Sequence, residues 1–284
     1  LMYKLKILSS GITNTSTQYK QLAKKHWDAI AKPLDSLGEF ERIFQKLSAI
    51  FESEVPVIDK KCITVMCSDN GVVEEGISQS GKEVTLAVAK SMALGTSSIS
   101  VLCRSCASDL MVIDIGIDSF DSDIYSMGVI NHKLMHGTNN FVKEKAMPPD
   151  ISLRAVLSGI EIVENLKSKG VNIIGTGEMG IGNTTTSSAL SSALLNLPVA
   201  NVTGRGAGLN DIKLQRKIDI IECGINRYGF RDKSFIDSIN SKSIDTRVLA
   251  TIDLLSSIGG LDIAALTGIF IGGAIHKIPI VIDG

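Results

Sequence analysis

Short apolar segments alternate with helical segments along most of the chain, and this order constrains the fold more than any other feature. Apolar runs predict strands at residues 62–67, 110–115, 171–175, 199–202 and 278–282. Helical spacing predicts helices near residues 83–103, 150–169, 184–196, 210–228, 245–257 and 261–276. Strands that alternate with helices indicate the α/β class, with a doubly wound, mostly parallel sheet.

A polar or glycine-rich cluster follows each predicted strand. These clusters occupy residues 68–71, 114–116, 175–183, 203–208 and 283–284. Ligands of parallel α/β sheets bind outside the carboxyl ends of the strands. We therefore expect the five clusters to meet in one binding site.

The length and composition fit one large domain with a small appendage. Two further helices are predicted near residues 16–31 and 36–52, so we expect a small-domain helical segment over residues 1–55 and a nucleotide-binding α/β domain over residues 56–284. A net charge of −1 and 5% aromatic residues argue against nucleic acid as a partner. Charged residues and a proline interrupt the most apolar stretch, 258–282, so no membrane span is expected.

The cysteine pattern indicates a reducing compartment. The chain has five cysteines, an odd number, and no recognisable signal peptide, which predicts a cytoplasmic protein. Cys103 and Cys106 have C-x-x-C spacing, but no second such pair accompanies them. We therefore expect no metal site and no cofactor.

The glycines of residues 173–190 form the most informative loop. Gly175, Gly177 and Gly180 match the G-x-G-x-x-G pattern of dinucleotide sites. Such a site also needs an acidic residue about 20 positions later for the ribose, and residues 197–201 contain none. The loop also lacks the lysine of a Walker A motif. Both observations argue against a dinucleotide or triphosphate site.

The same loop suits a single phosphate. Gly180, Gly182, Asn183 and Thr184 open a predicted helix, where we expect free backbone N–H groups and hydroxyls to converge. The helix dipole also favours an anion at this position. A purely structural turn is the alternative, although a turn needs only one or two glycines.

Glu178 lies at the centre of this loop. A phosphate repels a neighbouring carboxylate, so the presence of a glutamate here requires a functional reason. It can accept a hydrogen bond from a sugar hydroxyl or stabilise a cationic transition state; alternatively, it is a helix-start glutamate. A second anion-binding feature favours the functional interpretation. Arg205 lies between two glycines, of which Gly206 is one, and Lys217 follows on the next predicted helix.

Residues 177–185, with the sequence GEMGIGNTT, resemble the signature of the nicotinate-nucleotide:dimethylbenzimidazole phosphoribosyltransferases. Further segments resemble this family in the same order, so the resemblance covers nearly the whole chain. These segments are residues 36–38, 69–78, 83–85, 203–209, 259–265 and 278–284.

The resemblance implies a parallel α/β sheet, a small helical domain from both chain ends, and usually a dimer. It implies transfer of a 5-phosphoribosyl group from nicotinate mononucleotide to the lower-ligand base of a cobamide, a step of cobalamin biosynthesis, with release of nicotinate. Glu178 is then the catalytic candidate near the ribose. The expected phosphate and ribose site consists of Gly177, Gly180, Gly182, Asn183, Thr184, Arg205, Gly206 and Lys217.

Two positions depart from the family pattern where the acceptor is expected to bind. Asn70 stands where the family usually has histidine, and Lys82 stands where glutamine is common. We expect Asn70, Ser78 and Lys82 to contact the acceptor. A lysine there would stabilise a phenolate, so the acceptor is either a benzimidazole or a phenol. The alternative is that Lys82 points to solvent.

The glutamate that serves as base in this family lies several dozen residues beyond the position of Gly284. We expect either that a further segment carries this base or that a partner subunit supplies it. The chain is then a homodimer, or a heterodimer with a homologue, and in the second case it is a partner-dependent or non-catalytic subunit. The remaining alternative is a nucleotide-binding oxidoreductase on the same type of sheet.

Overall fold

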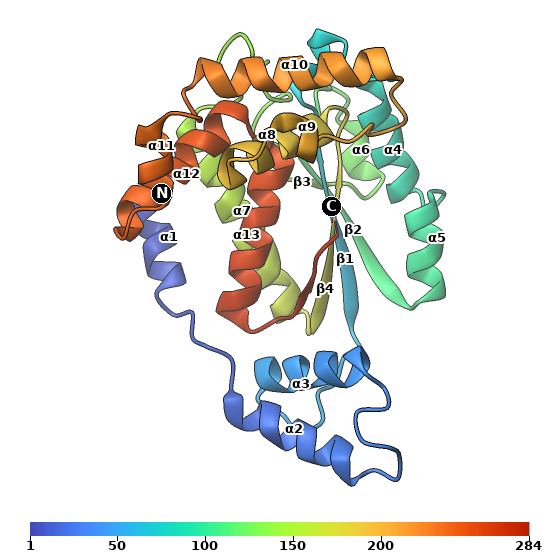
Figure 1. Cartoon of the computed structure of the whole chain (residues 1–284). Coiled ribbons are helices and arrows are strands. Elements are labelled where there is room, and N and C mark those ends of the chain that lie inside the picture. Colours follow the sequence, from blue (N-terminus) through green and yellow to red (C-terminus); the bar gives the residue numbers. More distant parts are fainter. Residues whose placement is uncertain (284) are drawn as a thin grey trace.

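A five-stranded sheet forms the centre of the computed structural model, which describes residues 1–283 (Figure 1). The strands are β1 (Lys61–Ser68), β2 (Ser108–Gly116), β3 (Ile130–Asn131), β4 (Ile173–Met179) and β5 (Ile280–Val281). Their order across the sheet is β3-β2-β1-β4-β5, and each neighbouring pair is parallel. This arrangement confirms the predicted α/β class with a doubly wound parallel sheet.

Two pairs of helices cover the two faces of the sheet (Figure 1). They are α7 (Pro149–Ser168) and α13 (Leu261–His276) on one face, and α4 (Glu83–Ala93) and α5 (Ser98–Ser105) on the other. Successive side chains of a strand point to opposite faces, so β1 contributes to both layers. Met66 packs in the core with α7 and α13, whereas Val65 packs in the core beneath α4.

Helices α7 and α13 approach each other closely enough for their backbones to touch. A Cβ atom on Gly159 would meet the carbonyl oxygen of Ala265, and a Cβ atom on Gly268 would meet that of Val156. Only glycine permits such an approach. This contact fixes α13, and therefore the start of α13 at Leu261, relative to the sheet.

The helix predicted over residues 83–103 is divided into α4 and α5. Gly95 adopts a φ of +77°, and the Ser97 side chain then accepts the backbone N–H of Ser100 as the cap of α5. A left-handed glycine commonly ends a helix, which explains the break. By length and composition, Glu83–Ser105 is the one stretch of the described chain that qualifies as a membrane span. Its two halves instead contact the strands of the sheet.

Three helices lie at the carboxyl ends of the strands (Figure 1). They are α8 (Asn183–Leu195), α9 (Val199–Val202) and α10 (Asp211–Arg227). The strand predicted at residues 199–202 is therefore wrong, because these residues form α9. Pro198 has a φ of −53° at the start of α9, and Val199 is buried in the core. A four-residue segment such as Val-Ala-Asn-Val has no periodicity that separates a strand from one turn of a buried helix.

A helical hairpin lies at the amino ends of the strands (Figure 1). It consists of α2 (Thr17–Ala29) and α3 (Glu39–Phe51). The Trp27 ring packs edge-on against Phe40 and Phe44, with ring centroids 6.2 and 5.2 Å away. Helix α1 (Met2–Ser9) instead contacts α13. The division of the chain at residue 55 into a helical segment and an α/β domain stays a prediction.

The remaining elements are short connections and one helix of the outer layer. They are the 3-10 helix η1 (Gly71–Glu75) and the α-helices α6 (Asp123–Ser126), α11 (Lys233–Ile239) and α12 (Ile244–Ile258). The strand predicted over residues 278–282 is present only as Ile280–Val281. Strand β3 was not predicted, because two residues carry no detectable pattern.

Candidate active site

The polar clusters after β1, β2 and β4 meet at one edge of the sheet, as predicted. The Asp69 backbone N–H donates to Gly116 O at 3.0 Å, which joins the ends of β1 and β2. The cluster at residues 203–208 follows helix α9 and not a strand. It still reaches this edge, because a Cβ atom on Gly206 would lie 3.1 Å from the Thr184 hydroxyl oxygen at the start of α8.

The first turn of α8 lines a small cavity of about 70 Å³, which we name the α8 cradle. It is bordered by residues 77–79, 180–185, 205–207, Leu209 and Lys217. Gly182 precedes α8 with a φ of +93°, a conformation that favours glycine. Some of the expected free N–H groups are occupied: Asn183 N–H donates to Gly180 O at 3.1 Å, and Thr184 N–H donates to Asn183 Oδ1 at 2.7 Å.

Lys217 is the buried cation of the α8 cradle. Its side chain comes from α10 and is 1% exposed, and its Nζ donates to Thr184 Oγ1 at 2.8 Å and to Gly204 O at 3.3 Å. Burial lowers the pKa of Lys217 to about 8. Among residues 1–283 no carboxylate pairs with it, although buried charges are normally paired. This arrangement is suited to an incoming anion.

Arg205 lines the same cradle but is already paired. Its guanidinium forms an ion pair with Asp211 and donates to Leu209 O at 2.8 Å, and its side chain is about half exposed. Gly206 has a φ of +54°, a conformation that favours glycine, and a Cβ atom there would lie 3.1 Å from Thr184 Oγ1. Arg205 thus shapes the loop, and Gly206 permits its turn beside Thr184.

Glu178 faces a different cavity from the α8 cradle. It lies on β4 and lines a mostly apolar cavity of about 510 Å³, together with Gly177, Met179 and Asp283. Burial raises the pKa of Glu178, a hydrogen bond from Asn183 Nδ2 lowers it, and the charge of Asp283 raises it. Asn183 therefore joins the two cavities, since it bonds Glu178 and also begins α8. This separation limits the repulsion expected between Glu178 and a bound phosphate.

The glycine loop is held from behind by side chains of two other elements. Ile181 N–H donates to Thr85 Oγ1 at 3.1 Å, and Asn70 Nδ2 donates to Ile181 O at 3.4 Å. A Cβ atom on Gly180 would meet the carbonyl oxygen of Ser68. The loop therefore has little freedom to move relative to β1 and α4.

The three residues expected at the acceptor do not line one cavity. Asn70 and Lys82 border a polar cavity of about 240 Å³, whereas Ser78 borders the α8 cradle. Lys82 forms an ion pair with Asp118, and the Asp118 hydrogen bond raises the pKa of Lys82. The Lys82 side chain is 57% exposed, so the alternative that it points to solvent stays open beside its ion pair with Asp118.

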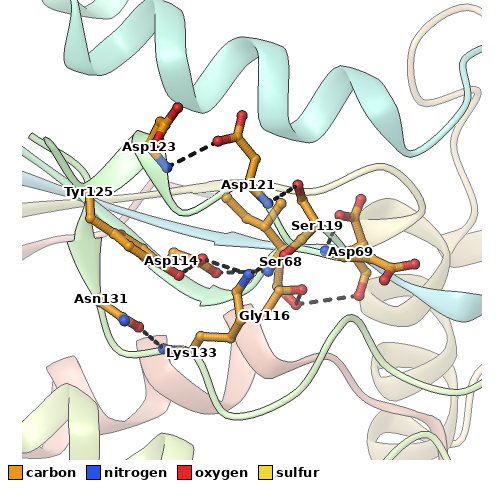
Figure 2. Close-up of polar contacts among 12 residues, drawn as sticks. Ser68, Asp69, Asp114, Gly116, Ser119, Asp121, Asp123, Tyr125, Asn131 and Lys133 are labelled. Carbon is orange, nitrogen blue, oxygen red and sulfur yellow. Dashed lines mark hydrogen bonds and ion pairs between the residues drawn. The ribbon is translucent and has the colours of Figure 1, made fainter. Parts of the chain in front are cut away.

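A buried ion pair supports the wall of this polar cavity (Figure 2). Asp114, at the end of β2, is fully buried and lies 3.2 Å from Lys133 Nζ. The Tyr125 hydroxyl also donates to Asp114, and burial with this contact raises the pKa of Tyr125. Figure 2 also shows Asp69, whose carboxylate accepts the backbone N–H of Asp118 at 2.8 Å. These contacts order the loop between β2 and β3.

Three residues near the site were not singled out from the sequence as functional. They are Asp69, Thr85 and Asp262, each at most 2% exposed. Asp262 carried a usable signal, because it is an acid within the most apolar stretch of the chain. Thr85 and Asp69 carried no such signal beyond their place in the segments 83–85 and 69–78, which resemble the family.

A parallel α/β sheet whose edge carries a helix start and a buried lysine, with no carboxylate partner in the described part of the chain, is typical of phosphate-binding α/β proteins. The family model described as "Phosphoribosyltransferase" matches residues 12–284. The chain belongs to this family and is therefore an enzyme of the glycosyltransferase type. The oxidoreductase alternative is not favoured.

Relatives and solved structures agree with this membership. The chain is 42% identical over 275 residues to the nicotinate-nucleotide--dimethylbenzimidazole phosphoribosyltransferase of Ruminiclostridium cellulolyticum, covering 97% of this chain and 73% of the relative. It is 44% identical over 263 residues to the protein of the same name from Acetivibrio thermocellus, covering 93% and 70%. The crystal structure of CobT from Thermus thermophilus superposes with a TM-score of 0.82 at 28% identity, covering 94% of this chain and 74% of that one.

Proposed function

We propose that the protein transfers the 5-phosphoribosyl group of nicotinate mononucleotide to an aromatic base that becomes the lower ligand of a cobamide. The observation that carries this proposal is Lys217, a buried cation without a carboxylate partner in the described chain, beside the start of α8. A monoester phosphate would supply the missing negative charge. The names of the relatives support both the donor and the type of acceptor.

The donor would bind with its phosphate in the α8 cradle and its ribose near Asn183 and Glu178. During transfer, the bond between C1 of the ribose and the pyridinium nitrogen breaks, and nicotinate leaves with the electron pair. The sugar carbon then carries positive charge until the acceptor bonds to it. The carboxylate of Glu178, which lies on β4 and accepts a hydrogen bond from Asn183, is partly buried. It is therefore suited to stabilise this positive charge.

For the acceptor we propose a benzimidazole or a phenol. A phenol must lose its proton, and the cation of Lys82 would stabilise the resulting phenolate. Asn70 and Lys82 border the polar cavity and Ser78 borders the cradle, so these residues would contact the acceptor from two sides. A phenolate that binds Lys82 must then displace the Asp118 carboxylate from its ion pair with this lysine.

We further propose a cytoplasmic protein that works as a homodimer or as a heterodimer with a homologue. Five free cysteines among the described residues suit a reducing compartment. In a heterodimer, the partner would supply the base that removes the acceptor proton.

The test is to incubate the purified chain with nicotinate mononucleotide and either 5,6-dimethylbenzimidazole or phenol, and to measure release of nicotinate and formation of an α-riboside phosphate. Turnover by the chain alone supports an active homo-oligomer. Turnover only after addition of a co-purifying homologue supports the heterodimer. If nicotinate mononucleotide fails to bind the chain with or without that homologue, the proposed function is wrong.

A further inference from the structure

Two buried oxygens behind the glycine loop have no hydrogen-bond partner among the described residues. They are Asn70 Oδ1 and Asp262 Oδ2, on side chains that are 2% and 0% exposed. A buried polar atom without a partner costs free energy, so each requires an explanation. The two side chains approach the same point, because a Cβ atom on Gly260 would meet Oδ1 of Asp262, the oxygen next to Oδ2 on the same carboxyl group, and would lie 2.9 Å from Asn70 Oδ1.

The two oxygens cannot satisfy each other as they stand, since both are acceptors. One added proton solves the problem: a protonated Asp262 carries an O–H that can donate to Asn70 Oδ1. The other oxygen of Asp262 already accepts the backbone N–H of Ile263 at 2.9 Å. A single proton would therefore provide both buried atoms with a partner.

The orientation of the Asn70 amide decides whether the glycine loop is held. In the structure, Asn70 Nδ2 faces Ile181 O at 3.4 Å, while Oδ1 faces the side of Gly260 and Asp262. An ionised Asp262 would attract Nδ2 instead. The amide would then turn its oxygen toward Ile181 O, where two acceptors repel, and the loop would lose one of its two side-chain contacts.

We propose that Asp262 is a positioning residue that keeps its proton in the active enzyme, donates it to Asn70 Oδ1, and so holds the phosphate-binding glycine loop in place. This proposal rests on the proposed function for the identity of the ligand. It gives Asn70 a second role, the support of the loop, beside the contact with the acceptor proposed above.

The surroundings of Asp262 favour its neutral form. Burial raises the pKa of Asp262 to about 7 and the charge of Glu178 adds to this rise, while the backbone N–H groups of Ile263 and Asp262 and the Asn70 side chain act in the opposite direction and do not cancel it. The titratable groups near Asp262 are Cys67 on β1 and Glu178 on β4, and the charges of Asp114 on β2 and Asp69, just after β1, act on the same Cys67 thiol. All of these are acidic, and Lys133, the cation beside them in the described chain, is paired with Asp114.

The first experiment measures thermal stability against pH for the wild type and Asp262→Asn. Asparagine keeps the shape and the donor but cannot ionise. Because the pKa of Asp262 is raised in the folded state, the wild type should lose stability relative to the variant as pH rises from about 4 to about 7, and the difference should then stay constant. Asp237→Asn on the exposed face of α11 is the matched control and should show no such change.

The second experiment measures the affinity for nicotinate mononucleotide over the same pH range. One pH unit above the pKa, about a tenth of the wild type keeps the proton, so its apparent affinity should fall about tenfold relative to Asp262→Asn. The titration of Lys217 occurs in both proteins and cancels in the ratio. In the Asn70→Ala background, aspartate and asparagine at position 262 should give the same pH profile.

The outcomes separate this inference from the proposed function. Equal stability profiles for the wild type and Asp262→Asn would overturn the assignment of the proton, whatever the enzyme binds. Equal affinity profiles would overturn the positioning role even if the proton is present. If the mononucleotide fails to bind either protein at any pH, the proposed function is wrong, and the stability comparison still decides whether Asp262 is protonated.

Discussion

Lys217 Nζ lies 2.8 Å from Thr184 Oγ1, so the buried cation of α10 contacts the first turn of α8. In the proposed function both elements would contribute to anion binding, Lys217 by its charge and α8 by its dipole. Because the two groups are in contact, the charge of Lys217 and the dipole of α8 act at the same place, beside the carboxyl ends of the strands.

Replacing Lys217 with methionine should separate binding from stability. Loss of one partner of a buried charge pair costs about 2–5 kcal/mol, so the Kd for nicotinate mononucleotide should rise at least about 30-fold. The free protein should be as stable as the wild type or more stable, because an unpaired buried charge is removed. Titration calorimetry and thermal unfolding check both results, with exposed Lys242→Met as the control. Unchanged affinity would remove Lys217 from the site.

Binding should also be coupled to proton uptake. Burial lowers the pKa of Lys217 to about 8 in the free enzyme, so affinity should be highest well below pH 8 and should fall as pH rises through that value. A bound phosphate favours the ammonium form, so binding between about pH 8 and 9 should take up a proton. Calorimetry in buffers of different ionisation enthalpy measures this uptake. Lys217→Met should show none from this group, and equal uptake in both proteins would contradict the assignment.

Glu178→Gln should lower turnover by more than about tenfold while leaving thermal stability nearly unchanged. The amide keeps the contact with Asn183 but loses the negative charge that stabilises the developing sugar cation. Initial rates at saturating donor measure the effect, and Glu164→Gln on the exposed face of α7 is the control. A wild-type kcat/KM in Glu178→Gln would remove the residue from the reaction.

Replacement by alanine should affect stability differently at two loop glycines, Gly180 and Gly204. A methyl group on Gly180 would collide with the Ser68 carbonyl oxygen, so Gly180→Ala should destabilise the protein by about 1–3 kcal/mol and weaken donor binding. Gly204 has no atom within 4 Å of its Cβ position, so Gly204→Ala should change stability by less than about 0.5 kcal/mol. Denaturant titration of both variants checks the contrast; an equal loss would show that the contact of Gly180 is not the cause.

Lys82→Gln should shift the choice of acceptor. If the lysine stabilises a phenolate, the ratio of the rates with phenol and with 5,6-dimethylbenzimidazole should fall in the variant. Asp118→Asn should raise the same ratio, because it frees Lys82 from its ion pair. Initial rates with both acceptors measure the ratios, and equal preference in all three proteins would discard the role of Lys82.

The central strands and the start of α8 could be predicted because their signals are local. Strands β1, β2 and β4 follow from mostly apolar segments of five or six residues, and the α8 cradle follows from Gly180 and Gly182 before a run of threonines. The roles of the cradle residues stay predictions. The run at residues 199–202 was misassigned because it is too short for its period to be read.

The supports of the site could not be predicted because they join distant parts of the chain. Asn70 and Ile181 are 111 positions apart, and Thr85 and Ile181 are 96 apart. No spacing rule relates such residues. The ion pair of Lys82 with Asp118 is likewise a product of the folded loops, so the sequence left open whether this lysine was free.

The backbone contact between α7 and α13 has a consequence for how new specificity can arise. Because the backbones of α7 and α13 are in direct contact at Gly159 and Gly268, the two helices form one rigid unit on their face of the sheet. Neither helix can shift to accommodate a larger side chain. Laboratory evolution toward other acceptors should therefore accumulate its changes in the loops above the strand ends. Libraries that vary the contact positions of α7 and α13 would yield mostly misfolded protein.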